Sequence, residues 1–174
     1  MIENAQAGSA EAFRGLVELY APLTERTARV ILHSRDRAED AVQDAWLDVW
    51  RGLRSFDSER PFRPWLLAVV ANRCRMEARK EIHMPQSLPF TDGTVGTLAG
   101  PGDPSEGSDP DLARALRRLD DEQRRILALR YYADLKLEEV AAIVGAPLGT
   151  VKSKLHRTLA ELRAIFSEQY AGDR

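Results

Sequence analysis

Cysteine and histidine are scarce in this chain, and long hydrophobic runs are missing. Of its 174 residues, one is a cysteine, Cys74, and three are histidines. A single cysteine cannot form a disulfide within the chain, which fits a reducing compartment, and these residues do not have the spacing of metal ligands. No apolar run is long enough to span a bilayer, and the N-terminus does not have the profile of a signal peptide. We therefore expect a cytoplasmic protein with no metal, no other cofactor and no membrane insertion.

An overall positive charge is also missing, because 25 lysines and arginines face 27 aspartates and glutamates, for a net charge of −2. This balance does not exclude a nucleic-acid partner, which requires positive charge on one surface and not over the whole chain. The hydrophobic content of 44% is enough to build cores and argues against global disorder. The length of 174 residues suits one or two small domains.

No strand signals are found, and apolar residues recur at helical spacing over most of the first half. This pattern predicts helices over residues 9–32, 36–53 and 64–82. Ser9 is a suitable N-cap for the first helix, and Asp36 with Glu39 is typical of a capping box for the second. The sequence therefore predicts an all-α protein.

The composition changes between Met84 and Pro110. This stretch contains five prolines, five glycines and four acidic residues, but no lysine or arginine. We interpret it as a flexible acidic linker that spans roughly 90 Å when fully extended. The expected organisation is two small helical domains, at residues 1–83 and 111–174, joined by a linker at residues 84–110.

The second half carries the pattern of a helix-turn-helix. A short helix is expected over residues 111–119, and Asp120 or Asp121 is expected to cap the next one. Two amphipathic segments then follow on either side of a turn at Gly145. In this motif the second helix enters the major groove of DNA.

The second helix of this motif places polar residues opposite its apolar stripe. Lysine and arginine can contact phosphates or guanine edges, serine and histidine can contact either, and a slim first turn lets the backbone approach DNA. The candidate residues are Thr150, Lys152, Ser153, His156 and Arg157. We interpret Lys154 and Arg163 as phosphate contacts or plain surface. The alternative for the whole set is a solvated helix face that happens to be basic.

The third helix of the first half carries a second polar face. Asn72, Arg75 and Arg79 recur on one side of it, and Phe62 and Arg63 lie just before it. Arginines can hold a nucleic-acid backbone while rings take bases and an amide reads a base edge, which suits a single strand. The alternatives are a charged solvent face and, for Phe62, a place in the core.

The second helix has an outward strip that contains Asp40, Gln43, Asp44, Leu47, Asp48 and Arg51. Clustered carboxylates are compatible with a metal-dependent nuclease, but no histidine accompanies them on this helix. An exposed apolar residue among charges often marks an interface, so Leu47 favours contact with another protein.

Two parts of the sequence resemble bacterial RNA polymerase sigma factors. The segments Arg37–Trp50 and Phe62–Arg73 are similar to sigma region 2. The segments Leu119–Tyr132 and Gly149–Leu155 are similar to sigma region 4. The two regions occur in this order with no folded domain between them, as in the extracytoplasmic-function (ECF) group.

This resemblance implies a non-enzymatic initiation subunit that gives core RNA polymerase its promoter specificity. The strip of Asp40, Gln43, Asp44 and Leu47 would dock on the β′ clamp helices, and region 4 would meet the β flap. Many members of the group are held inactive by an anti-sigma factor, which is therefore a candidate partner.

Roles in binding promoter DNA also follow from the resemblance. The loop at residues 56–63 and the third helix would hold a flipped base of the single-stranded −10 element, and the last helix would read the −35 element as duplex. The implied −10 contacts are Phe62, Arg63, Asn72, Arg75 and Arg79, and the implied −35 contacts are Thr150, Lys152, Ser153, His156 and Arg157. The linker would thread towards the active-site channel of the polymerase.

Two other functions are weighed against this one. A stand-alone helix-turn-helix regulator would bind duplex DNA without polymerase and would not use Asn72. A small metal-dependent nuclease would require a divalent cation together with Asp40, Asp44 and Asp48.

Overall fold

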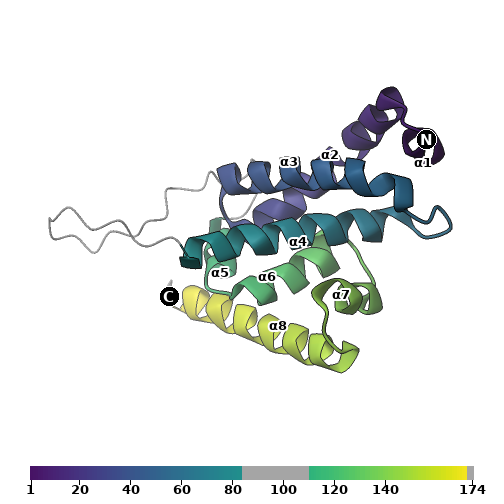
Figure 1. Ribbon diagram of the computed structural model, residues 1–174. Coiled ribbons are helices and arrows are strands. Elements are labelled where there is room, and N and C mark those ends of the chain that lie inside the picture. Colours follow the sequence, from purple (N-terminus) through teal and green to yellow (C-terminus); the bar gives the residue numbers. More distant parts are fainter. Residues whose placement is uncertain (84–109, 172–174) are drawn as a thin grey trace, which may run out of the picture.

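The computed structural model describes residues 1–83 and 110–171, and within these ranges every regular element is a helix. This confirms the all-α class. Figure 1 shows the helices of the first half above those of the second half. At the centre, α6 (Asp121–Leu127) lies between α4 (Phe62–His83) and α8 (Leu148–Ala171) and contacts both.

Three long helices form the first half, with two short helical segments at one end. The elements are α1 (Ile2–Gln6), α2 (Ala10–Leu32), α3 (Arg35–Gly52), the 3₁₀ turn η1 (Leu53–Ser55) and α4. Leu16, Val49 and Leu66 are buried at the centre of this bundle. Cys74 belongs to the same core, and burial raises the pKa of its thiol to about 12. The reactive thiolate is therefore scarce at neutral pH.

Side-chain caps set where α2 and α3 begin. Ser9 Oγ accepts the backbone N–H of Ala12 at 3.2 Å, which confirms Ser9 as the N-cap of α2. The second expected cap is wrong, because Ser34 Oγ accepts the N–H of Arg37 at 3.4 Å and makes Ser34 the N-cap of α3. Ser34 has the extended backbone that an N-cap needs, whereas Asp36 already lies inside the helix.

The second half contains the helix-turn-helix. Its elements are α5 (Pro110–Arg117), α6, the π-helical turn η2 (Ala128–Tyr132), α7 (Leu137–Val144) and α8. Asp120 caps α6: its carboxylate accepts the N–H of Gln123 at 2.7 Å, and the Gln123 side chain accepts the N–H of Asp120 at 2.8 Å. The prediction that Asp120 or Asp121 caps this helix is thus confirmed. The π turn was not predicted.

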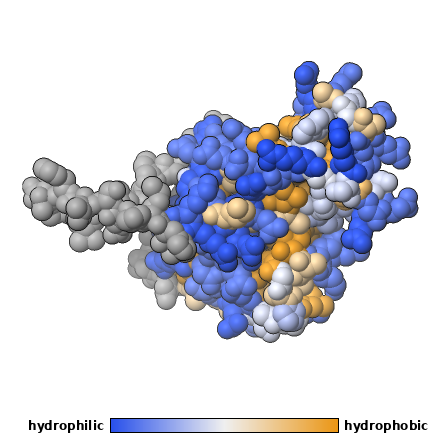
Figure 2. All heavy atoms as spheres, viewed as in Figure 1, coloured by the Kyte–Doolittle hydropathy of each residue, from blue (hydrophilic) through white to orange (hydrophobic). Residues whose placement is uncertain are grey.

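The two halves pack along a seam, with α2 and α4 on one side and α6 and η2 on the other. Across this seam, Arg124 Nε donates to the carbonyl of Ile31 at 3.1 Å, and Arg63 Nη2 donates to that of Ala133 at 2.7 Å. In Figure 2 the apolar side chains of the visible face gather in a strip that descends from α4 towards α7. Buried residues of both halves join in one hydrophobic core, so the two predicted domains are in direct contact.

His33 ends α2 at this seam. Its backbone is left-handed, with a φ of 50°, and its N–H donates to the carbonyl of Arg29 at 2.9 Å. Burial, and after it the positive charge of Arg124, lower the pKa of its imidazole to about 4. The folded protein therefore keeps this ring neutral well below neutral pH.

The lowered pKa of His33 predicts that the stability of the protein decreases in acid. The unfolded chain binds a proton near the ordinary pKa of 6.5, whereas the folded chain does so only near pH 4. Between these values the unfolded state binds more protons, so the free energy of unfolding falls as the pH drops. Asparagine tolerates a left-handed backbone, so His33→Asn should keep the fold. In this variant the acid-induced decrease in the free energy of unfolding should be about 2 kcal/mol smaller than in the wild type, after allowance for partial exposure. Urea unfolding of both proteins at pH 7 and pH 4.5 measures it, and equal falls would contradict the role of His33.

Candidate nucleic-acid and polymerase interfaces

The helix-turn-helix is formed by α7 and α8 with Gly145 at the turn. Gly145 has a φ of 71°, a conformation that glycine adopts without strain, and its N–H donates to the carbonyl of Ala141 at 3.0 Å. Val140 of α7 and Val151 and Leu155 of α8 are buried. Burial of this apolar stripe decides which side of α8 faces outward.

The outward side of α8 carries the expected DNA contacts. Thr150, Lys152, Ser153, His156 and Arg157 are all exposed, and the last four line a shallow hollow on the surface. Two cationic side chains lie there beside a hydroxyl group and an imidazole. Such a surface can contact the phosphate backbone and donate hydrogen bonds to base edges.

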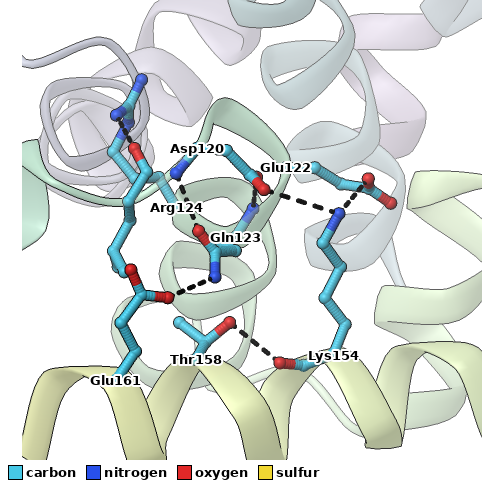
Figure 3. Close-up of polar contacts among 8 residues, drawn as sticks. Asp120, Glu122, Gln123, Arg124, Lys154, Thr158 and Glu161 are labelled. Atoms are coloured by element: carbon cyan, nitrogen blue, oxygen red, sulfur yellow. Dashed lines mark hydrogen bonds and ion pairs between the residues drawn. The ribbon is translucent and has the colours of Figure 1, made fainter. Parts of the chain in front are cut away.

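Lys154 lies on the inward side of α8 and holds this helix against α6 (Figure 3). Its Nζ forms an ion pair with Glu122 and lies 3.8 Å from a carboxylate oxygen of Asp120. A second link is provided by Gln123, whose Nε2 donates to Glu161 at 2.9 Å. The expectation that Lys154 is a phosphate contact or plain surface is therefore wrong, because two carboxylates of the neighbouring helix hold its charge.

Two lysines on α8 should thus respond differently to the same substitution. Lys154→Met should lower the free energy of unfolding by about 1 kcal/mol, since it removes a partly exposed ion pair between helices. Lys152→Met is the matched control and should leave stability nearly unchanged, because Lys152 is exposed. Thermal and urea unfolding measure both variants. Equal stability losses would show that Lys154 does not clamp α8.

The outward side of α4 carries Asn72, Arg75 and Arg79, and all three are exposed. Arg73 is turned away from this face and hydrogen-bonds Asp48 of α3. Arg73 therefore links α3 to α4 and does not add its charge to this exposed face. The amide of Asn72 therefore shares this exposed face with the guanidinium groups of Arg75 and Arg79.

Phe62 is a core residue in this structure and not the exposed base contact that we expected. Its ring is 5% exposed. It packs with Tyr20, Phe56 and Trp65 at centroid distances of 5.4, 5.6 and 5.6 Å. Aromatic pairs at such distances stabilise a core beyond the area that they bury, so Phe62 shapes the start of α4 from within.

Arg63 is half-buried and belongs to the seam. Its Nη2 donates to the carbonyl of Ala133, which directly follows the π turn. In this arrangement the side chain is directed at the second half of the chain and not at solvent. Spacing along the sequence could not show this, because the two residues are 70 positions apart.

The acidic strip, consisting of Asp40, Gln43, Asp44 and Leu47, lies on the outward side of α3. All four residues are exposed, and Leu47 is 53% exposed. The predicted outward placement of these four residues is therefore confirmed. The strip presents two carboxylates, an amide and one large apolar side chain on the surface.

Asp48 is less exposed than the acidic strip and accepts a hydrogen bond from Arg73 of α4. The hydrogen bond from Arg73 holds the pKa of its carboxyl below the ordinary range. Asp44 lies 3.7 Å from the same guanidinium group. In the described part of the chain, no three side chains of histidine, cysteine, aspartate or glutamate gather as metal ligands would. This geometry gives the nuclease alternative no support.

Comparison with known proteins decides the family. The sequence matches Sigma-70 region 2 over residues 16–82 and Sigma-70 region 4 over residues 115–164. It is 31% identical to the ECF RNA polymerase sigma factor SigL of Mycobacterium tuberculosis, over 96% of each chain. This chain belongs to the ECF sigma factors. It is also 26% identical to the ECF RNA polymerase sigma factor SigW of Bacillus subtilis, over 93% of this chain and 92% of SigW.

Solved structures show the same fold. CnrH, in complex with the cytosolic domain of CnrY, superposes with a TM-score of 0.69 at 24% identity, over 96% of this chain and 95% of that one. RpoE of Bartonella quintana, in complex with the anti-sigma factor NepR, gives a TM-score of 0.69 at 24% identity, over 91% and 98% of the two chains. The helical arrangement is thus that of sigma factors.

The general function of the chain follows from its membership in this family. Sigma factors are non-catalytic, DNA-binding initiation factors that associate with core RNA polymerase and direct it to promoters. Residues 1–83 contain the region 2 match, and residues 110–171 contain the region 4 match. None of the described helices is both long and apolar enough to cross a membrane.

Proposed function

We propose that this ECF sigma factor reads its promoter at two points with two different helices. The outward side of α8 binds the −35 element as duplex, and the outward side of α4 holds the −10 element as single strand. The observation that carries the proposal is that each of these helices buries its apolar side and exposes a side with positive charge. A tether between the two allows modest individual contacts to combine, because it raises the effective concentration of the second site.

At the −35 element, we assign direct contact to the exposed residues of α8. Arg157 suits a guanine edge, which a guanidinium group binds with two hydrogen bonds. Lys152 suits a phosphate, since an ammonium group acts as a point charge. Ser153 and His156 can complete the readout, and Thr150 lies where the first turn of the helix approaches the backbone.

At the −10 element, we assign the base edge to Asn72 and the backbone phosphates to Arg75 and Arg79. A side-chain amide both donates and accepts, so it can pair with the edge of an unstacked base. Unstacking a base costs a few kcal/mol, so this surface favours only sequences whose contacts with the unstacked base offset that cost. Phe62 is buried in the core, so we assign it no direct contact with the −10 element, and one N–H group of Arg63 is held by the carbonyl of Ala133.

We further propose that the acidic strip of α3 is the docking surface for core RNA polymerase. Its carboxylates suit a basic partner, and the exposed Leu47 supplies apolar area at one end of the strip. The β′ clamp helices are the partner that family membership favours, and the β flap is the corresponding partner of region 4. An anti-sigma factor remains a candidate regulator.

Reconstituted transcription tests the proposal as a whole. The purified chain is added to bacterial core RNA polymerase with fragmented genomic DNA, and the transcripts are sequenced. We expect initiation at a defined set of start sites that share two upstream sequence elements. Transcription no different from that of core enzyme alone would contradict the proposal, and duplex binding without any polymerase association would favour the stand-alone regulator.

Replacement of Arg157 should weaken binding of the −35 duplex. Arg157→Ala should cost about 1–3 kcal/mol if the side chain reads a base, with the loss concentrated on sequences that carry the contacted guanine. Fluorescence anisotropy with duplexes at matched salt measures the effect. Unchanged affinity would remove Arg157 from the interface, and an equal loss on every sequence would make it a phosphate contact.

Replacement of Asn72 should impair use of the −10 element without loss of polymerase binding. Asn72→Ala removes both the donor and the acceptor of the amide, so we expect slower promoter opening and weaker preference at one −10 position. Permanganate footprinting and transcription from promoters with single −10 changes measure these effects. Unaltered opening and preference, with normal affinity for core polymerase, would contradict the assignment.

A further inference from the structure

The N-terminal helix α1 lies outside the residues that match region 2, yet it is bonded to that region. Gln6 Nε2 donates to the carbonyl of Leu53 at 3.1 Å and to the carbonyl of Phe56 at 2.6 Å. One side-chain nitrogen thus uses both of its hydrogens on backbone groups 47 and 50 residues away. This double contact connects the start of the chain to the end of η1.

The two carbonyls lie where the chain leaves η1 for the exposed stretch at residues 57–60. The carbonyl of Leu53 also accepts the N–H of Phe56 at 3.1 Å, which closes the last turn of η1. Within the loop itself, hydrogen bonds join near neighbours: the N–H groups of Glu59 and Arg60 both donate to Asp57. Gln6 therefore holds the root from which this exposed loop projects.

The position of Gln6 is itself fixed by its surroundings. Ala5 is buried, and the N–H of Ser9 donates to the carbonyl of Asn4 at 3.0 Å, which ties α1 to the cap of α2. Phe56, whose carbonyl Gln6 holds, packs its ring on Trp65 of α4 at a centroid distance of 4.7 Å. The Gln6 amide thus links α1, which is held to α2, with Phe56, which is held to α4.

We propose that Gln6 is a positioning residue for −10 recognition. By holding two carbonyls at the root of the loop, it keeps the loop in one orientation beside α4 before DNA arrives. A loop that is ordered in advance loses less conformational entropy on binding, so the correct base is favoured more strongly. The inference rests on the proposed role of α4 in reading the −10 element, and on a share in that role for the loop that leads into α4.

The test uses holoenzyme with core RNA polymerase and a promoter that the wild-type protein selects. Transcription from this promoter is compared with transcription from versions that carry single −10 changes. Gln6→Ala should lower the preference for the original sequence about fivefold, the size of one net hydrogen bond of about 1 kcal/mol. Gln6→Glu has no hydrogen-bond donor and should lower this preference at least as much as Gln6→Ala. Gln6→Lys restores a donor and should recover part of the preference.

Asn4→Ala is the matched control, since it removes an exposed amide from the same helix. It should leave the preference unchanged, and every variant should bind core polymerase as the wild type does. Equal losses on all promoters together with a lower melting temperature would make Gln6 a stabilising residue only and would overturn the inference. Wild-type protein that does not discriminate between −10 sequences would overturn the proposed −10 role itself, whatever the Gln6 variants do.

Discussion

Burial of one apolar side on each long helix is the constraint on which both proposed DNA-binding surfaces depend. In α8, Val151 and Leu155 are buried, and this fixes Lys152 and Arg157 on the outward side. A rotation of the helix by one residue would expose apolar side chains, each of which contributes roughly 1.5–3 kcal/mol when fully buried. The recognition surface is therefore held by packing, and its polar residues can be changed without loss of the fold.

The positions of the cations show how a chain with a net charge of −2 can still expose positive charge locally. Arg73 is bound to Asp48, and Lys154 to Glu122, so these cations neutralise carboxylates and hold helices together. Lys152 and Arg157 of α8, by contrast, lie on the exposed side. Positive potential thus gathers on selected surfaces although the whole chain carries a charge of −2.

Helical spacing was enough to predict the long helices and the outward residues of α4 and α8, because both depend on a period of 3.6 residues. It could not predict that Lys154 holds α8 to α6, since the partner, Glu122, lies 32 positions away. Nor could it predict α1, because five residues are too few to show a period. The burial of Phe62 and the cap at Ser34 depend on packing and on backbone conformation, which composition does not report.

The seam between the two halves bears on how a compact chain reads two separate DNA elements. Its recorded hydrogen bonds include those of Arg63 to Ala133 and of Arg124 to Ile31. Each contributes about 1 kcal/mol net, since water competes for the same groups. An N–H of Arg63 that is directed at Ala133 cannot at the same time be directed at a phosphate. Its other N–H groups are not bonded to Ala133, so the seam limits Arg63 without excluding it from a phosphate contact. If the two regions separate when they bind, the free energy that each gains from polymerase and promoter must exceed the free energy of the seam contacts.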